Sequence, residues 1–200
     1  NNSVIHNSFV PSYDAETNSL NAVVITNSLI PRATEKGKYI LQFSFEKEHV
    51  DLSRFDGAPF LKEHQLSLSN QLGVVEKSHL STEQKKLTAK VKLSDNPDHA
   101  GIVSDIKNGI IRNCSVGAYI YKAEQTGEDE SGTPIVLATS WAPYELSAVP
   151  AGADKNAHFF NLENKNNKEI TKMENEEQEV INAGTETLAP QISADDVIKA

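Results

Sequence analysis

The chain has 200 residues, a formal net charge of −9 at pH 7 and a single cysteine. This length suits one substantial domain with some chain left over, and the negative charge argues against nucleic acid as the main partner, because phosphate binding needs clustered Lys and Arg. A single cysteine excludes an internal disulfide. No apolar run approaches the roughly 20 residues of a membrane-spanning helix, so we expect no membrane partner.

The first half of the chain predicts short strands joined by loops. Residues 1–18 are polar and are expected to form a flexible arm. The segment 31–37 begins with proline, ends with glycine and predicts a loop, while Gly73 is a candidate β-bulge. Runs of β-branched and aromatic residues, or alternation of apolar with polar residues, predict four strands: 21–26, 38–45, 71–77 and 87–93.

The second half begins with one well-marked helix. Asn96 can cap its N-terminus, Pro97 suits the first helical position, and Gly109 can end it as the C′ residue. An apolar stripe should face the core from this helix and contains Ala100, Ile102, Val103 and Ile106.

The rest of the folded region predicts strands over 110–122 and 135–149, the latter as one strand or two, separated by a polar hairpin loop at 125–132. Residues 161–200 carry four Lys against nine acids, a net charge of −5, and predict a disordered linker. We therefore assign 19–160 to the folded domain. We expect 161–200 to lead to a further C-terminal region, in a segment of a longer protein.

Three short stretches carry the candidate chemistry, in a fixed order along the chain. Phe-Leu-Lys-Glu-His ends at His64, Asn-Cys-Ser-Val-Gly centres on Ser115, and Tyr-Glu-Leu-Ser-Ala-Val-Pro carries Glu145. Together they offer a base, a nucleophile and an acid that orients the base. A serine hydrolase uses this arrangement, because a hydroxyl becomes nucleophilic only beside an imidazole held by a third group.

Each of the three residues also has an ordinary structural interpretation. His64 could be an exposed loop histidine, Ser115 an ordinary strand serine, and Glu145 the partner of a Lys or Arg in a salt bridge. Gly117, two positions after Ser115, would let a substrate backbone approach closely.

Other residues carry weaker hypotheses. Cys114 is a rival nucleophile, but neighbouring strand residues point to opposite faces, so Cys114 and Ser115 cannot both face one site. Arg112 could support a developing oxyanion, although a solvated surface charge is the favoured interpretation. His79 and His99 lack metal-ligand spacing, so we expect neither a metal nor a cofactor.

In this order and with these flanks, the three stretches resemble the prohead proteases of tailed bacteriophages of the HK97 type, which are related to the herpesvirus assembly proteases. That family shows an apolar residue and Glu/Asp-His, then a short helix ending in glycine, then Ser-(Val/Ile)-Gly. A later strand carries Glu-(apolar)-Ser-(apolar)-Val-Pro-Ala. The corresponding segments of this chain are 60–64, 107–109, 114–117 and 145–151.

The resemblance implies a mainly β fold with flanking helices, a small, closed, mostly antiparallel β-barrel. It implies a serine endopeptidase with His64 as general base and Ser115 as nucleophile. Glu145 is placed third, where the viral relatives use a second histidine. It further implies an enzyme enclosed in the phage procapsid, within the host bacterial cytoplasm. There it would cut the scaffold or the scaffolding segment of the major capsid protein, and itself, and could do so as a homo-oligomer.

Three alternatives stay open at this point. The domain could be a catalytically inactive assembly or scaffold module of the procapsid, whose tail recruits a partner. It could be a plain β-barrel binding domain, which would need an apolar pocket. It could also be a cysteine protease that uses Cys114.

Overall fold

The computed structural model describes residues 13–35 and 37–160, and in this part of the chain it forms a single sheet. Its strands are β1 (Ser19–Thr26), β2 (Ile30–Thr34), β3 (Gly37–Phe43), β4 (Pro59–Lys62), β5 (Gln71–Ser81), β6 (Lys86–Leu93), β7 (Asn113–Glu128), β8 (Pro134–Val149) and β9 (His158–Phe160). One α-helix is described, α1 (Ala100–Lys107), with the short 3₁₀ turns η1 (Lys47–His49), η2 (Leu68–Asn70) and η3 (Pro97–His99).

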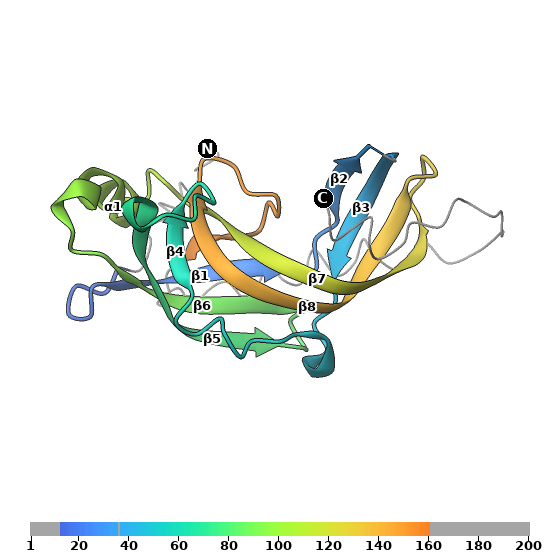
Figure 1. Cartoon of the computed structure of the whole chain (residues 1–200), viewed down its shortest axis with the longest axis horizontal. Coiled ribbons are helices and arrows are strands. Elements are labelled where there is room, and N and C mark those ends of the chain that lie inside the picture. The colour runs from blue at the N-terminus through green and yellow to red at the C-terminus, as the bar shows by residue number, and fades with distance from the viewer. Residues whose placement is uncertain (1–12, 36, 161–200) are drawn as a thin grey trace, which may run out of the picture.

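Strand β8 pairs with three other strands, β7, β3 and β4. It pairs with β7 along one edge, and along its other edge it pairs first with β3 and then with β4. The strands β4, β5, β6, β1, β9 and β7 follow in order and return to β8, so they form a ring. The β2–β3 hairpin lies at one end of the molecule and α1 at the other (Figure 1).

The mainly β class is confirmed, whereas closure into a barrel stays a prediction. The β3–β8 and β4–β8 pairings are parallel, so the sheet is mixed rather than purely antiparallel. Parallel neighbours need crossover connections, and the long segments between β4 and β8 supply them by way of β5, β6, α1 and β7. Strand β8 can thus receive β4, and with it His64, on the edge opposite β7.

Alternation of apolar residues builds the core as the sequence predicts. In β6, Leu87, Ala89, Val91 and Leu93 are buried, confirming the predicted strand. Trp141 in β8 is fully buried, packs edge-on against Phe43 at 4.8 Å between ring centroids, and donates its Nε1–H to the Ser44 carbonyl at 2.8 Å. A buried indole with its N–H satisfied fixes the middle of β8 against β3.

The predicted helix is confirmed, with a 3₁₀ first turn. Asn96 Oδ1 accepts the Asp98 N–H at 3.1 Å, and Gly109 has the left-handed φ of +69° expected of a C′ glycine. Val103 and Ile106 are buried, whereas Ala100 is exposed. The buried stripe of this short helix is therefore narrower than expected.

Several segments differ from the sequence-based expectation, among them β4, which was not predicted, and residues 125–128 of the predicted hairpin loop, which lie in β7. The predicted loop over 31–37 is wrong, because most of it lies in β2, an edge strand that pairs only with β3. Pro31 is compatible with this position, since an edge strand can leave the missing N–H toward solvent. Strand β9 was not predicted. It is three residues long and pairs chiefly with β1.

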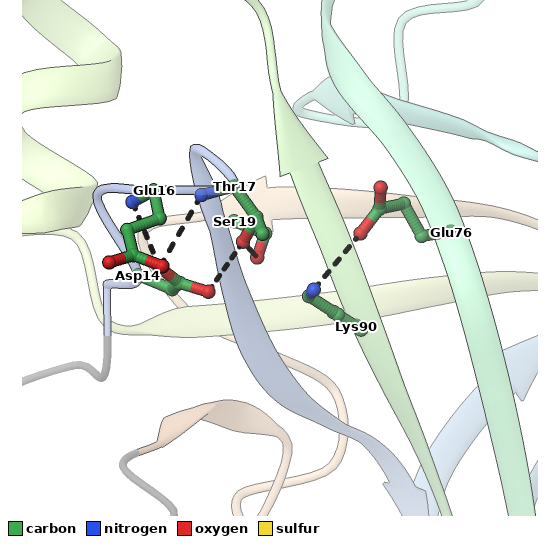
Figure 2. A network of polar contacts seen from close by, with 6 residues as sticks. All are labelled: Asp14, Glu16, Thr17, Ser19, Glu76 and Lys90. Atoms are coloured by element: carbon green, nitrogen blue, oxygen red, sulfur yellow. Dashed lines mark hydrogen bonds and ion pairs between the residues drawn. The ribbon is translucent and has the colours of Figure 1, made fainter.

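The described part of the expected N-terminal arm is held in place. Asp14 and Ser19 form a β-bridge, and the Asp14 carboxylate accepts from the Glu16 and Thr17 N–H groups and from Thr17 Oγ1 (Figure 2). The same view shows Lys90 of β6 paired with Glu76 of β5 across the sheet at 3.5 Å. The remainder of the arm, 1–12, and the predicted linker, 161–200, lie outside the described residues.

Candidate active site

His64 is presented by a tight turn directly after β4. Glu63 and His64 both adopt the left-handed conformation, with φ of +51° and +60°. Such a conformation costs a non-glycine residue about 1–3 kcal/mol and persists only where neighbours hold it. The neighbours here come from β8, because the Glu63 N–H donates to the Ala148 carbonyl at 3.1 Å and the His64 N–H donates to Ser147 Oγ at 3.0 Å.

Glu145 of β8 lies beneath the imidazole and is only 1% exposed. Its Oε1 is 2.6 Å from His64 Nδ1, and its Oε2 accepts the Ser147 hydroxyl at 2.7 Å. An ionised carboxylate only accepts hydrogen bonds, so Nδ1 carries the proton and Nε2 is left as the basic atom of a neutral ring. The two bonds give the buried carboxylate the partners that it needs. The alternative interpretation, a salt bridge from Glu145 to Lys or Arg, does not occur within 13–35 and 37–160.

The environment shifts the titration of His64 upward. The hydrogen bond that His64 donates to Glu145 is the largest cause and raises the pKa of the imidazole, and the charge of Glu145 adds to this effect. Partial burial and the positive charge of Arg32 in β2 act in the opposite direction. The pKa of His64 therefore lies above the ordinary value of 6.5, and the neutral, basic form becomes dominant as the pH rises past it.

Ser115 is brought to the neighbouring strand position. The register of β7 against β8 places Ser115 directly opposite Ser147, and Gly117 opposite Glu145. Directly opposite side chains share one face of the sheet, with Cβ atoms about 4.5–5.5 Å apart, so Ser115 stands beside the Ser147 hydroxyl that holds His64. In the part of the chain that the structure describes, the Ser115 hydroxyl forms no hydrogen bond with the His64 imidazole.

Because Gly117 has no side chain, the Glu145 carboxylate can occupy the space beside it. A Cβ at this position would overlap Glu145 Oε1 and would lie 2.7 Å from Tyr144 Cζ. The carboxylate and the tyrosine ring thus pack directly on the glycine backbone. This close approach, rather than access for substrate alone, explains why glycine is suitable two positions after Ser115.

A hollow in the surface adjoins Ser115. It has a volume of about 380 Å³, and Ser115, Gly117 and Tyr144 contribute to its lining, with the β2–β3 hairpin opposite. The candidate nucleophile therefore lines a space that could receive part of a ligand, whereas His64 and Glu145 do not line it.

Cys114 does not share this site. Its side chain is fully buried, its Sγ lies 3.1 Å from the Val23 carbonyl, and burial strongly raises the pKa of the thiol. A reactive cysteine needs the thiolate form and access, so the cysteine-protease alternative is not supported. Arg112 donates its Nε–H to the carbonyl of Gly109, just after α1, at 2.7 Å.

Two residues of this region were not identified from the sequence. Ser147 had a signal, because residues i and i+2 of a strand share a face, so the pattern Glu145-x-Ser147 places a hydroxyl beside the carboxylate. Arg32 had none, since its segment was predicted to be a loop. In the segments that the structure describes, no three His, Cys, Asp or Glu side chains gather as metal ligands, and no helix there has the length and apolarity to cross a membrane.

The chain is similar to known phage proteins. A protein titled major capsid protein, from Halomonas phage phiHAP-1, is 33% identical over 107 residues, which make up 52% of this chain and 17% of the relative. The chain therefore covers less than a fifth of that relative's length. No solved structure matches. The profile of the caudovirus prohead serine proteases matches residues 27–176. Because this match spans more than half of the chain, the chain belongs to the caudovirus prohead serine protease family.

Proposed function

We propose that this domain is a serine endopeptidase of phage procapsid maturation, with Ser115 as nucleophile, His64 as general base and Glu145 as the acid that orients the base. The observation that carries the proposal is the 2.6 Å contact between His64 Nδ1 and the buried Glu145 carboxylate. It fixes one tautomer and leaves Nε2 to accept a proton. Ser115, one cross-strand pair away, is the hydroxyl available to supply that proton.

The proposed reaction is acyl transfer in two steps. His64 Nε2 takes the proton of the Ser115 hydroxyl as Oγ bonds to the peptide carbonyl carbon, and the C–N bond then breaks as the imidazolium protonates the leaving amine. A water molecule, deprotonated by the same imidazole, attacks the acyl-enzyme and releases the carboxylate product and the serine. Glu145 stabilises the imidazolium at each stage, consistent with its direction of effect on the pKa of His64.

The substrates that we propose are the phage scaffold or the scaffolding segment of the capsid protein, and the chain itself. The family profile supports a role in capsid maturation, inside the procapsid. Similarity to part of a protein titled major capsid protein supports a close relation to capsid proteins. The acidic segment 161–200 could contain a self-cleavage site or join the protease to a scaffold region.

A catalytically inactive assembly module is the second candidate, and the same capsid relative favours it. Mass spectrometry of the purified chain, followed over time, discriminates the two. Wild type should be compared with Ser115→Ala and with Cys114→Ala, each alone and with co-expressed capsid protein. The two substitutions are matched controls, since each truncates one small side chain and the residues are adjacent.

The protease predicts new fragments of the chain or of the capsid protein in wild type and Cys114→Ala, and none in Ser115→Ala. An intact wild-type chain beside intact capsid protein would support the inactive module instead. Equal cleavage by Ser115→Ala would show that a contaminating protease is responsible and would remove the support for Ser115.

A further inference from the structure

The hollow beside Ser115 has one wall built from a single face of the β2–β3 hairpin. Ile30 pairs with Leu41, and Arg32 pairs with Tyr39, and all four line the hollow. Residues that alternate along paired strands share a face, so this side of the hairpin is directed at the hollow. Ala33 and Lys38, one register position further, belong to the opposite face.

The other wall is the stretch of β7 that carries the candidate nucleophile. Consecutive residues of β7 from Ser115 to Ile120 line the hollow, although alternate side chains of a strand point to opposite faces. The hollow therefore adjoins one edge of β7, the edge that does not pair with β8. A chain lying in the hollow would pass directly beside Ser115.

Arg32 brings a positive charge to this lining, which is partly apolar and partly polar. No hydrogen bond and no carboxylate within ion-pair distance involves Arg32 in the parts of the chain that the structure describes. Its side chain is exposed. Its charge acts on His64 as well as on Tyr39, which places it within electrostatic reach of the candidate dyad.

We infer that this hollow receives a side chain of the peptide substrate next to the scissile bond, and that Arg32 makes it select an acidic residue. The inference rests on the proposed protease function. A guanidinium presents a planar fork of N–H donors that matches a carboxylate, and the aliphatic walls suit the methylene groups of a glutamate. Arg32 is then a specificity-determining residue, on a different element from those of the proposed triad.

Asp154 also lines the hollow, but its carboxylate oxygens are held by hydrogen bonds from other residues. It is buried, its Oδ2 accepts the Thr26 N–H at 2.6 Å and the Thr26 hydroxyl at 2.8 Å, and its Oδ1 accepts the Asn156 N–H at 2.9 Å. A carboxylate holding three donors is a structural tie between β1 and the loop before β9. The Asp154 oxygens are therefore engaged with neighbouring residues, whereas Arg32 has no hydrogen bond or ion pair within the described residues.

The chain itself contains acidic residues of this kind after the described domain. Residues 161–200 contain nine Asp or Glu. The described chain ends in β9, where His158 pairs with Asn113, two residues before Ser115. Self-cleavage within the acidic segment would match the charge of Arg32.

The test uses the full chain with its natural C-terminus and fluorogenic peptides built on a cut mapped by mass spectrometry. At each position flanking the cut, the peptides carry Glu, Gln or Lys. Wild type is compared with Arg32→Gln and Arg32→Glu. Lys38→Glu is the matched control, because it makes the same charge change on the face of the hairpin turned away from the hollow. Fluorescence of the buried Trp141 verifies folding of each variant.

At one position, wild type should cleave the Glu peptide with a kcat/KM about 10-fold or more above that of the Gln peptide, as expected for a charge-assisted pair. Arg32→Gln should abolish that preference. Arg32→Glu should reverse it toward Lys, while Lys38→Glu should behave as wild type. Equal loss on all three peptides would assign Arg32 to the reaction itself and overturn the inference, as would unchanged preferences in Arg32→Glu. Cleavage that depends on Ser115 but ignores charge would leave the protease standing without this pocket. No cleavage by wild type, as by Ser115→Ala, would overturn both.

Discussion

Gly117→Ala should damage the site through a single methyl group. The added Cβ overlaps Glu145 Oε1, lies 2.7 Å from Tyr144 Cζ and lies 2.9 Å from Glu145 Cδ. Glu145 is 1% exposed, so its carboxylate cannot simply turn into solvent. The overlap can be relieved only by moving the carboxylate off the imidazole or by shifting β7 away from β8.

The magnitude follows from the two contacts at risk. Overpacking of a filled interior costs about 1–3 kcal/mol, and losing a hydrogen bond to a charged group costs about 1.5–3 kcal/mol. Replacing glycine also restricts the unfolded chain, which returns about 0.4–1 kcal/mol. We therefore expect Gly117→Ala to lower the free energy of unfolding by about 3 kcal/mol and to lower the pKa of His64 toward its ordinary value.

Urea unfolding followed by Trp141 fluorescence measures the first effect, because the chain has one tryptophan and it is fully buried. NMR titration of His64 measures the second. Both are done in a Ser115→Ala background, which prevents self-cleavage. Gly101→Ala is the matched control: a Cβ there meets nothing within 4 Å, and in helix α1 the exchange should stabilise by about 0.5–1 kcal/mol. A Gly117→Ala protein within about 0.5 kcal/mol of wild type, with His64 titrating unchanged, would refute the packing argument.

Three further outcomes follow from the same geometry. Ser147→Ala leaves Glu145 Oε2 buried without its hydrogen-bond donor, so the free energy of unfolding in urea should fall by about 1–3 kcal/mol. The variant's kcat should fall by a larger factor than its KM changes. Unaltered stability and kcat would contradict the positioning role of Ser147. Glu145→Gln removes the group that raises the pKa of His64, so the acidic limb of the kcat/KM profile should move to lower pH as the maximum falls. A limb that stays in place would assign it to another group. Cys114 should resist a thiol reagent in the native protein and react in urea, since burial suppresses its thiolate; rapid native labelling would disprove its burial.

The local pattern was enough to predict much of the fold. The alternation in β6 and the capped helix before Gly109 were recognised because burial of one face or one stripe leaves a direct periodic signal. Strand β2 was missed because Pro31 and the following polar residues suggest a loop, and only pairing with β3 makes them a strand. Strand β9 is too short to show any periodicity.

The candidate site, like the fold, could be predicted from the sequence only in part. The pairing of His64 with Glu145 follows from residue types that need each other, an imidazole and a carboxylate in apolar sequence. The distance from Ser115 to that pair depends on the register of β7 against β8, which no local pattern encodes. Arg32 reaches the hollow only because the β2–β3 hairpin lies opposite β7, an arrangement set by the whole sheet.

The strained turn at Glu63 and His64 also bears on when the site can form during synthesis. The turn is made early in the chain, but its hydrogen-bond partners are the Ala148 carbonyl, the Ser147 hydroxyl and the Glu145 carboxylate, more than eighty residues later. Until β8 has been synthesised, the nascent chain lacks the residues that hold the imidazole in place. The arrangement of base and acid is therefore a property of the completed domain, and a ribosome-bound fragment ending before β8 would carry His64 and Ser115 without the geometry that joins them.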